Sequence, residues 1–400
     1  MNKQLLIVEE SLRDLKAHWF EYIKTIADVS ANNGWNTEVV CHIAVDKHIA
    51  DTLNTLPVFK YARYLDNNSK SYPGEKYIGF IVHSIRVLKA MWPVLKKKKY
   101  DHIFVPTVLI HHLLAWYVIA AFHPNRPKRI TLFFVTNPGV WNKENKVALL
   151  PQKTILLKSL LRFFAGMVRK GKVTMAVETD GAKREFEQLA GFAFVLLPHP
   201  VPFLPKQQST TNSYSGPLVF SCLGFARHEK GSDILKQVLL SYASSGLTDK
   251  KRFLVQWLDA FRMPDQTFCS NQELKSLDFV QLIDFSLKET EYANYLKQTD
   301  CMILPYRNSS YYARVSRIAI EAVSMGIPVI YTSGGWLQEL MEKFGAGIGI
   351  EDESEQELIN AIEKMQLNYS DYKQKALERI TSVQEYFTPE NFCKLLLQND

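Results

Sequence analysis

Short apolar runs alternate with longer amphipathic stretches along the first 200 residues of this 400-residue chain. Residues 17–32 and 108–122 have the length and the apolar spacing of helices. Strands that alternate with helices predict a parallel sheet with helices on both faces. The strands expected in this half are residues 5–8, 38–43, 102–106, 130–135, 172–179 and 194–200.

Residues 200–217 interrupt the alternation and predict a linker, because they are rich in Pro, Ser, Thr and Asn. The alternation then restarts and continues to a last helix that begins after Pro389. The pattern therefore predicts an α/β protein with two doubly wound, Rossmann-like domains. The elements expected in the second half are strands at residues 218–225, 252–258, 279–284, 301–306 and 328–333, and helices at 231–245, 289–299, 317–326 and 336–344.

Composition excludes several classes of protein. With 46% hydrophobic and 22% charged residues, the chain has the composition of a soluble globular protein. The longest apolar run, residues 108–122, is shorter than the roughly 18 to 20 residues that span a bilayer, so no membrane span is predicted. The five cysteines are scattered and form no Cys-x-x-Cys pair, which indicates a reducing compartment without a zinc site or a disulfide framework.

Charge is distributed unevenly along the chain. Residues 1–200 contain 28 Lys and Arg against 16 Asp and Glu, whereas residues 201–400 contain 20 against 25, so the halves carry +12 and −5 and sum to +7. A basic half favours an anionic partner such as a membrane surface. Nucleic acid is not expected, because no recognition motif or aromatic and basic stacking platform is present.

The stretch GFARHEKGSDIL, residues 224–235, lies between a predicted strand and a predicted helix and contains Arg227 and Lys230. A loop that leads into a helix N-terminus presents free backbone N–H groups, and two nearby cations would make it a strong diphosphate site. The alternative is a solvated turn.

The stretch RVSRIAIEAVSMGIPVIYTSGG, residues 314–335, contains a single carboxylate, Glu321. A loop is expected over residues 307–316 and a helix after it, on which Glu321 shares a face with Arg314 and Arg317. An internal ion pair is therefore one interpretation. The other is a carboxylate that accepts two hydrogen bonds from a vicinal diol such as a ribose.

Gly334 and Gly335 follow the next predicted strand and precede a helix. Glycines at such a junction let backbone N–H groups approach an anion closely, although a simple helix-entry turn has the same sequence. Ligands of doubly wound sheets bind outside the carboxyl ends of the strands. Three such junctions in one domain together indicate a site for a nucleotide diphosphate.

The segments that carry these junctions resemble the donor-binding half of retaining glycosyltransferases of family four, which have the GT-B fold. The first half is similar more loosely, through residues 18–40 and 177–201. The resemblance implies two domains that face a cleft. The implied bounds are 1–203 with the final helix at 384–400 for the acceptor-binding domain, 217–383 for the donor-binding domain and 204–216 for the linker.

The resemblance also implies roles for residues of the second half. Arg227 and Lys230 would bind the donor diphosphate, and Glu321 would bind the ribose. Cations and helix N-termini would replace a metal, so neither a metal nor a cofactor is expected, and the acidic run 351–353 is expected to cap the helix after it. The other implied donor contacts are Gly224, Ile283, which lies near the base, and the backbones of Val315, Ser316, Gly334 and Gly335.

The sequence departs from the family's pattern at three places. Ala313 stands where a second glutamate often contacts the donor sugar, which leaves the donor sugar and the activity open. Phe225 stands where an arginine is common, so the diphosphate role goes to Arg227. Lys16 and Ala17 replace a glycine pair before the first helix.

Several residues of the first half are candidates for the acceptor side. His18, at the start of the first helix, would orient the acceptor hydroxyl or the donor sugar, with a structural role as the alternative. Asn137 is a candidate in the loop after a strand. Asp180 resembles a family position at the cleft, but a helix N-cap is the first interpretation. His111 and His112 lie on an apolar helix and are expected in the core or partly exposed.

Residues 154–172, TILLKSLLRFFAGMVRKGK, have apolar positions near helical period with cations between them. Such a helix can lie on an anionic bilayer, and the four lysines at 96–99 would add attraction. A helix of the domain that packs on the sheet is the alternative.

Taken with these observations, the resemblance implies a retaining, metal-independent, hexosyltransferase-like enzyme of the cytoplasm that is peripheral on the inner face of the plasma membrane. It would move a sugar from a nucleotide diphosphate sugar to a glycan or lipid-linked acceptor. A role in bacterial surface-polysaccharide biosynthesis follows from the resemblance alone. The alternatives are a non-catalytic sugar-nucleotide-binding subunit, prompted by Ala313, and a sugar-nucleotide epimerase on the same fold.

Overall fold

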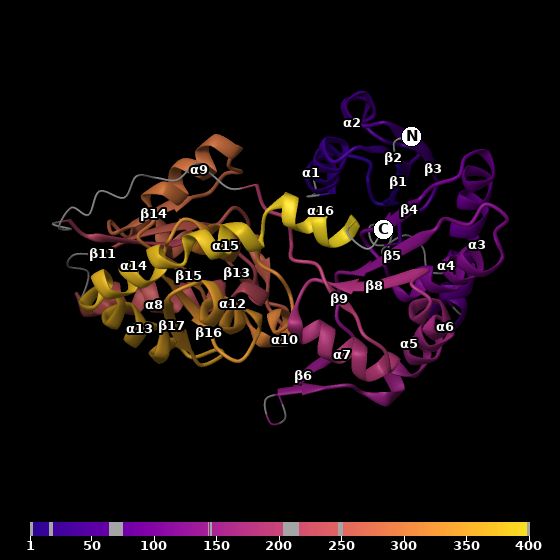
Figure 1. Ribbon diagram of the computed structural model, residues 1–400. Coiled ribbons are helices and arrows are strands. Elements are labelled where there is room, and N and C mark those ends of the chain that lie inside the picture. The colour runs from indigo at the N-terminus through magenta and orange to yellow at the C-terminus, as the bar shows by residue number, and fades with distance from the viewer. Residues whose placement is uncertain are drawn as a thin grey trace. The chain divides into compact units, whose positions relative to one another are not determined.

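The computed structural model describes residues 3–15, 19–63, 75–142, 144, 146–202, 216–246 and 251–397. The chain divides into two compact units (Figure 1). The first contains Met1–Val140, Val147–Pro200 and Pro389–Asp400, and the second contains Trp141–Lys146 and Val201–Thr388. Residues 204–215 of the expected linker lie outside the described residues.

The first unit is built on a seven-stranded sheet with the order β3-β2-β1-β4-β5-β8-β9, in which the paired strands are parallel. The order reverses between β1 and β4, so the topological switch point lies at the carboxyl ends of these two strands. The strands are β1 (Lys3–Val8), β2 (Trp35–His42), β3 (Thr55–Phe59), β4 (His102–Val105), β5 (Arg129–Phe134), β8 (Val173–Val177) and β9 (Val195–Leu196), and a separate pair is β6 (Val140–Asn142) with β7 (Lys146–Ala148).

Helices cover both faces of this sheet. On β1, Leu5 and Ile7 face one apolar cluster, with α1, α2 and α16, while Leu6 and Val8 face the other, with α3, α4, α5 and α7. Apolar residues at consecutive positions of a strand are typical of a sheet buried on both sides. The helices are α1 (Trp19–Asn32), α2 (Lys47–Thr52), α3 (Glu75–Lys97), α4 (Ile110–Phe122), α5 (Pro151–Phe163), α6 (Ala165–Arg169), α7 (Asp180–Ala190) and α16 (Pro389–Leu397).

The second unit repeats this architecture with a six-stranded parallel sheet in the order β14-β11-β10-β15-β16-β17. Its switch point lies between β10 and β15. The strands are β10 (Leu218–Cys222), β11 (Lys251–Gln256), β14 (Val280–Ile283), β15 (Cys301–Leu304), β16 (Val329–Thr332) and β17 (Gly347–Ile350), and a short antiparallel pair is β12 (Phe261–Arg262) with β13 (Phe268–Cys269).

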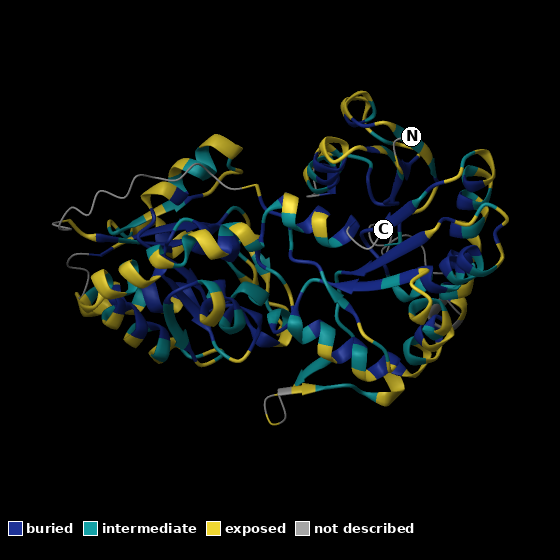
Figure 2. Cartoon of the chain, in the orientation of Figure 1, coloured by how far each residue is buried: buried dark blue, intermediate teal, exposed yellow. Residues whose placement is uncertain are grey.

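Two apolar clusters again cover the two faces of the sheet, one with α9, α11, α12 and α15 and the other with α8 and α13. Figure 2 shows the strands of both units buried and the exposed residues on the outer sides of the helices. The helices are α8 (Ser232–Ser245), α9 (Glu289–Gln298), α10 (Asn308–Tyr311), α11 (Arg317–Ser324), α12 (Trp336–Phe344), α13 (Glu355–Leu367), α14 (Tyr369–Glu378) and α15 (Ile380–Tyr386), with three-ten turns η2 (His228–Lys230) and η3 (Gln272–Ser276).

The predicted α/β class with doubly wound sheets is confirmed, and three segments differ from expectation. The helix expected at residues 154–172 is two helices, α5 and α6, because the chain turns at Phe164, whose ring is buried 5.6 Å from that of Tyr117. The loop expected at 307–316 contains α10. The sequence Gly347–Ile350 forms the edge strand β17, which its alternating glycines did not indicate.

One helix among the described residues is long and apolar enough to cross a membrane, judged by length and composition alone. It is the Ile78–Lys97 part of α3, with a mean hydropathy of 1.4. Val87, Met91 and Leu95 are buried in the core of the first unit, and α3 packs along α4. These residues form the face of α3 that packs on the core, whereas Ile78, Ile81 and Ile85 are 47%, 39% and 46% exposed.

Candidate functional site

The residues predicted to bind a donor lie at the carboxyl ends of four strands of the second sheet, three of which, β10, β15 and β16, are adjacent. Ile283 ends β14, and the loop with Gly224, Arg227 and Lys230 follows β10. The segments with Val315 and Ser316, and then Gly334 and Gly335, follow β15 and β16. Since β10 and β15 flank the switch point, the sheet topology brings these loops to the edge where ligands of such sheets bind.

The loop after β10 depends on two glycines. Gly224 has a φ of +91°, and its N–H donates to Oε1 of Gln256 at 2.7 Å. A Cβ atom on Gly224 would lie 2.9 Å from Nζ of Lys230, so the glycine leaves room for this amino group. Gly231 has a φ of +66° and packs against the carbonyl oxygen of Pro305, which follows β15. The loop therefore holds Lys230 close to the switch point.

The two cations of this loop differ in environment. Burial lowers the pKa of Lys230, whose Nζ lies 5.8 Å from the ring centroid of buried Tyr306. The side chain of Arg227 is 54% exposed and lies 3.4 Å from Glu229. A partly desolvated ammonium beside an exposed guanidinium can bind an anion strongly, because the ammonium has given up part of its hydration. Sequence reasoning missed Tyr306 because it lies in what was predicted as the end of a strand.

Glu321 is buried on α11 and both its carboxylate oxygens are engaged. Arg317 Nε donates to Oε1 at 2.8 Å, and the hydroxyl of Tyr292 on α9 donates to Oε2 at 2.5 Å. Of the two predicted ion-pair partners, Arg317 is bonded to Glu321, while Arg314 lies 6.0 Å from the ring of Tyr311. The ion pair is therefore present, and the tyrosine partner was not predicted.

Two helix N-termini lie beside these residues. Ser316 caps α11 by accepting a hydrogen bond from the N–H of Ala319 at 3.3 Å. Gly335 is the N-cap of α12, and a Cβ atom there would lie 2.7 Å from Oδ1 of Asn308. The first N–H groups of both helices can therefore serve an anion at this edge.

An arginine that was not predicted holds the loop after β15 in place. Arg307 donates to both carboxylate oxygens of Asp233, at 2.8 and 2.7 Å, and to Glu353 at 2.9 Å. Asp352 accepts a hydrogen bond from the N–H of Asn308 at 3.1 Å. The prediction that residues 351–353 cap α13 is therefore wrong: Ser354 is the cap, and these acids anchor the neighbouring loop.

The candidates in the first unit are partly reassigned. Asn137 lies 3.5 Å from Glu185 of α7, which also accepts the N–H of Gly139 at 2.7 Å. The N-cap of α7 is Thr179, so the preferred interpretation of Asp180 as the cap is wrong, and Asp180 is the first residue of the helix. His112 is buried and His111 is partly buried, as expected. His18, Lys16 and Ala17 lie outside the described residues.

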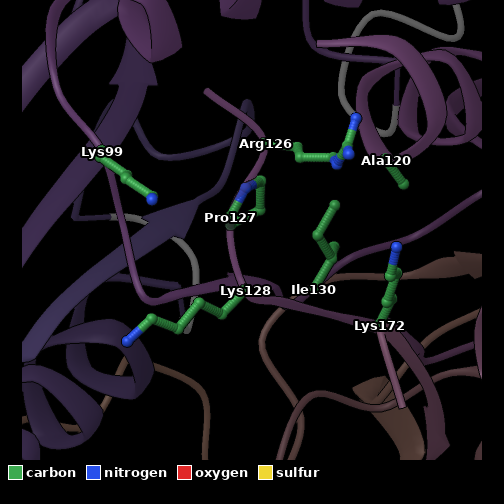
Figure 3. A pocket seen from close by; sticks show the side chains of 7 residues that line it. All are labelled: Lys99, Ala120, Arg126, Pro127, Lys128, Ile130 and Lys172. Carbon is green, nitrogen blue, oxygen red and sulfur yellow. The ribbon is translucent and has the colours of Figure 1, made fainter. Parts of the chain in front are cut away.

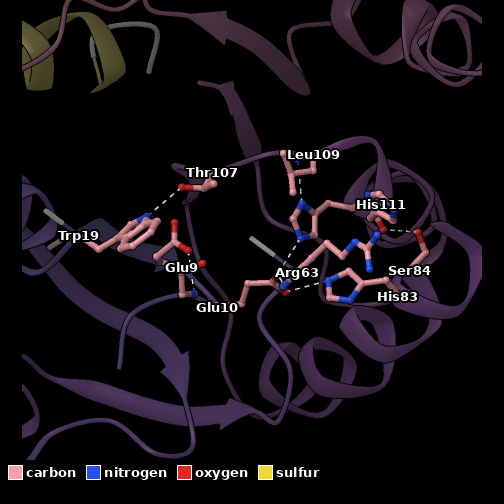
Figure 4. Close-up of polar contacts among 11 residues, drawn as sticks. Glu9, Glu10, Trp19, Arg63, His83, Ser84, Thr107, Leu109 and His111 are labelled. Carbon is pink, nitrogen blue, oxygen red and sulfur yellow. Dashed lines mark hydrogen bonds and ion pairs between the residues drawn. The ribbon is translucent and has the colours of Figure 1, made fainter. Parts of the chain in front are cut away.

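Glu9 and Glu10 follow β1 at the switch point of the first sheet and point to different neighbours (Figure 4). Glu10 lies 2.9 Å from Nε2 of His83 and accepts the N–H of Arg63 at 2.6 Å. Histidine neighbours hold the pKa of Glu10 well below its usual range against the opposing effect of burial. Glu9 accepts the N–H of Ser11 at 2.8 Å, and burial raises its pKa to about 7.

Glu10, His83 and His112 have the spacing of a metal site, with ligand atoms within 4.8 Å of one another, and form the one such group in the described part of the chain. The backbone N–H of Leu109 donates to Nδ1 of His112 at 2.9 Å. Nδ1 is thus an acceptor, and the proton of the neutral ring is on Nε2, the nitrogen 3.1 Å from Glu10. A metal-bound histidine instead donates its second nitrogen to a neighbour, so His112 does not fit a metal.

A pocket of about 200 Å³ lies elsewhere in the first unit, beside the amino ends of β4, β5 and β8 (Figure 3). This edge is opposite to the carboxyl ends where ligands of such sheets bind. Four cations line the pocket, which are Lys99, Arg126, Lys128 and Lys172.

Known proteins resemble the chain in part of its sequence and in its whole fold. Residues 264–368, in the second unit, match the family model described as glycosyl transferases group 1. Sucrose-phosphate synthase from Thermosynechococcus elongatus superimposes with a TM-score of 0.66 at 14% identity, over 99% of this chain and 98% of that one. The chain has the GT-B glycosyltransferase fold. No curated protein matches its sequence.

Two other GT-B structures match the whole length. A glycosyltransferase from Rickettsia africae has a TM-score of 0.66 at 14% identity and covers 100% of both chains. The Anabaena protein HepE, in complex with UDP and glucose, has a TM-score of 0.63 at 12% identity and covers 100% of this chain and 99% of that one. At such identities the likeness shows the GT-B fold, and the chemistry has to be argued from residues.

Proposed function

We propose that this GT-B protein is a retaining glycosyltransferase of family four that uses a nucleotide diphosphate sugar and needs no metal. The observation that carries the proposal is the convergence of cations, helix N-termini and one buried carboxylate at the switch point of the second sheet. Lys230 and Arg227 would bind the diphosphate, and Glu321 would accept the ribose hydroxyls. The HepE structure in complex with UDP and glucose supports this class of donor.

During sugar transfer, the proposed donor site has to stabilise mainly the negative charge that develops on the leaving diphosphate. Lys230, Arg227 and the N-termini of α11 and α12 are placed at strand ends where they could do so without a metal. In front-face transfer with retention, the leaving phosphate takes the proton of the acceptor hydroxyl. The protein then acts by positioning the substrates.

The first experiment is a thermal-shift screen of the purified protein against UDP-, GDP-, ADP- and TDP-sugars and the free nucleotides, without added metal. A ligand at about 100 times its dissociation constant stabilises the native state by roughly 2.7 kcal/mol. Glu321→Ala is expected to weaken binding by roughly 2–4 kcal/mol, because two hydrogen bonds to a charged acceptor are lost. Glu378→Ala, at an exposed position of α14, is the matched control.

Turnover separates the proposal from its alternatives. Sugar transfer to an acceptor, with the anomeric configuration followed by NMR, supports a retaining transferase. Binding without turnover supports a non-catalytic subunit, for which Ala313 is the reason, and turnover of the donor alone supports an epimerase or a hydrolase. A protein that none of these nucleotides stabilises does not have the proposed donor site.

We also propose a glycan or lipid-linked acceptor in surface-polysaccharide biosynthesis, at the cytoplasmic face of the plasma membrane. Leu160 and Phe164 of the 154–172 segment are buried in the core, as the alternative of a packed domain helix requires. Ile155 and Phe163 are 66% and 56% exposed, and Phe122 of α4 is 67% exposed. The ring centroid of Tyr117 lies 6.5 Å from that of Phe122 and 5.6 Å from that of Phe163, so these rings share one surface.

We define this surface by Phe122 and Phe163, and add the exposed Ile155 because it lies on the same helix as Phe163; cations accompany these residues. Lys158 and Arg162 are on α5, and Arg169 ends α6. Exposed aromatic and aliphatic side chains with interleaved cations favour an anionic bilayer. The other pocket cations, Arg126, Lys128 and Lys172, and the four lysines at 96–99 would add long-range attraction.

A further inference from the structure

The hydrogen bond from Tyr292 to Glu321 joins two helices that the sequence separates by 29 positions. Tyr292 lies in the first half of α9, directly after the loop that follows β14, and packs in the same apolar cluster as α11. Burial, followed by the charge of Glu321, raises the pKa of the Tyr292 hydroxyl well above its usual value. The Tyr292 hydroxyl therefore keeps its proton at neutral pH and can donate to Glu321.

The two protein donors use only half of the acceptor capacity of Glu321. An ionised carboxylate has about four lone-pair sites, two on each oxygen. Tyr292 takes one site on Oε2 and Arg317 takes one on Oε1, so one site on each oxygen is left. A vicinal diol needs this arrangement, because each of its two hydroxyls donates to a different oxygen.

The terminal torsion of a glutamate is broad, so a carboxylate without fixed partners turns easily. Arg317 by itself is a weak restraint, since its side chain is 47% exposed. The hydroxyl of Tyr292, a partly buried side chain packed against the apolar cluster of α11, is the second restraint. It fixes the plane of the carboxylate and with it the direction of both remaining lone-pair sites.

We infer that Tyr292 is a positioning residue that presents Glu321 to the two ribose hydroxyls of the donor and so makes the site selective for ribonucleotides. This inference rests on the proposed donor site and names one determinant of its specificity. Tyr306 links this pair to the diphosphate loop, because its ring centroid lies 5.8 Å from Nζ of Lys230 and it belongs to the apolar cluster against which Tyr292 packs. The arrangement connects ribose recognition to diphosphate recognition within one unit.

The plainer interpretation is that the Tyr292 bond only fastens α9 to α11. A fastening bond would stabilise every bound ligand equally, whereas a positioning bond would matter only for ligands with ribose hydroxyls. The ratio of affinities for a nucleoside diphosphate and its 2′,3′-dideoxy analogue distinguishes the two, since both ligands carry the same base and diphosphate.

The experiment measures this ratio by calorimetry in the full-length wild type, in Tyr292→Phe and in Tyr295→Phe, with the nucleoside diphosphate series that stabilises the wild type best. Tyr292→Phe removes one oxygen atom, and we expect it to weaken binding of the ribonucleotide about tenfold and to leave the dideoxy analogue within about twofold. Tyr295→Phe, one turn along α9, is the matched control and should leave the ratio unchanged.

A second variant removes the donor on the other oxygen without touching the core. Arg317→Met changes a half-exposed side chain and should lower the preference for the ribonucleotide over its dideoxy analogue. The inference can therefore still be tested if Tyr292→Phe fails to fold. Equal weakening of both ligands, or an unchanged ratio, overturns the positioning role. A wild type that binds no nucleoside diphosphate overturns the donor site itself, whereas binding without any preference for ribose overturns only this inference.

Discussion

Glu9 and Glu10 are neighbours at the end of β1, but their surroundings drive their pKa values in opposite directions. Glu10 has two histidines and a backbone N–H as partners, which favour its charged form. Glu9 is buried, and its Oε2 has no hydrogen-bond partner among the described residues, which favours its neutral form. The environment of each side chain, and not its type, decides its charge.

The raised pKa of Glu9 makes the stability of the first unit depend on pH. The folded state holds the proton up to about pH 7, whereas the unfolded chain releases it near 4.5. The stabilisation is therefore complete below pH 4.5 and is lost as the pH rises through about 7, by about 3 kcal/mol in total. Thermal or urea unfolding of Glu9→Gln should show this part of the pH dependence removed and a gain in stability at pH 8.

Glu38→Gln is a control of opposite sign. The partners Lys98 and Tyr100 lower the pKa of Glu38 against the opposing effect of burial, so this variant should lose stability at neutral and alkaline pH rather than gain it. An unfolding profile of Glu9→Gln that runs parallel to the wild type from pH 5 to 8 would contradict the assignment.

At the scale of single elements, helix α8 begins and ends at a glycine with nearly the same backbone conformation. Gly231 has a φ of +66° and Gly246 a φ of +68°. A Cβ atom at Gly246 would meet no atom of the described residues within 4 Å, whereas one at Gly231 would collide with the backbone of Pro305. The pair separates the cost of a left-handed conformation from the cost of a steric clash.

Gly246→Ala should lower stability by about 1 kcal/mol, which is the cost of the left-handed conformation for a residue with a Cβ atom. Gly231→Ala should cost more, roughly 2–4 kcal/mol, and should also weaken nucleotide binding, because relief of the clash moves the loop that carries Lys230. Unfolding and the thermal-shift assay measure the two effects. An equal loss of stability in the two variants would show that the loop after β10 can move to accommodate a Cβ atom at Gly231 without an additional energetic cost.

At the scale of whole elements, hydrophobic period predicted strand and helix positions well where the pattern was regular, as in β10, β15, α8 and α11. It failed at α5 and α6, where one continuous stripe is divided by the turn at buried Phe164. Periodicity reports which residues face a core, and a short turn between two helices on one core leaves it almost unchanged.

At the scale of the whole molecule, the uneven charge predicts that the basic first half, and not the acidic second half, binds an anionic membrane. The surface of Phe122, Ile155 and Phe163 belongs to the first unit, as do the four pocket cations. The double variant Ile155→Glu, Phe163→Glu should reduce co-sedimentation with phosphatidylglycerol vesicles about tenfold or more, because apolar contact is lost and negative charge is added.

Leu367→Glu is the matched control, since Leu367 is 84% exposed on the second unit. Wild-type binding should weaken with salt and be small on phosphatidylcholine vesicles. Binding of the double variant equal to that of the wild type would show that this surface is not the membrane contact.

Sequence alone determined the two-domain α/β architecture and the glycine junctions at the strand ends, because strand and helix periods and glycine conformations are local properties. Only the tertiary structure decided the partners of the polar groups, since these come from distant positions. Tyr292 reaches Glu321 across 29 residues, Arg307 reaches Asp233 across 74, and His83 reaches Glu10 across 73. No local pattern specifies such pairs. The fold alone brings the partners together and buries them, and partners and burial together decide whether each acid is charged and what it can bind.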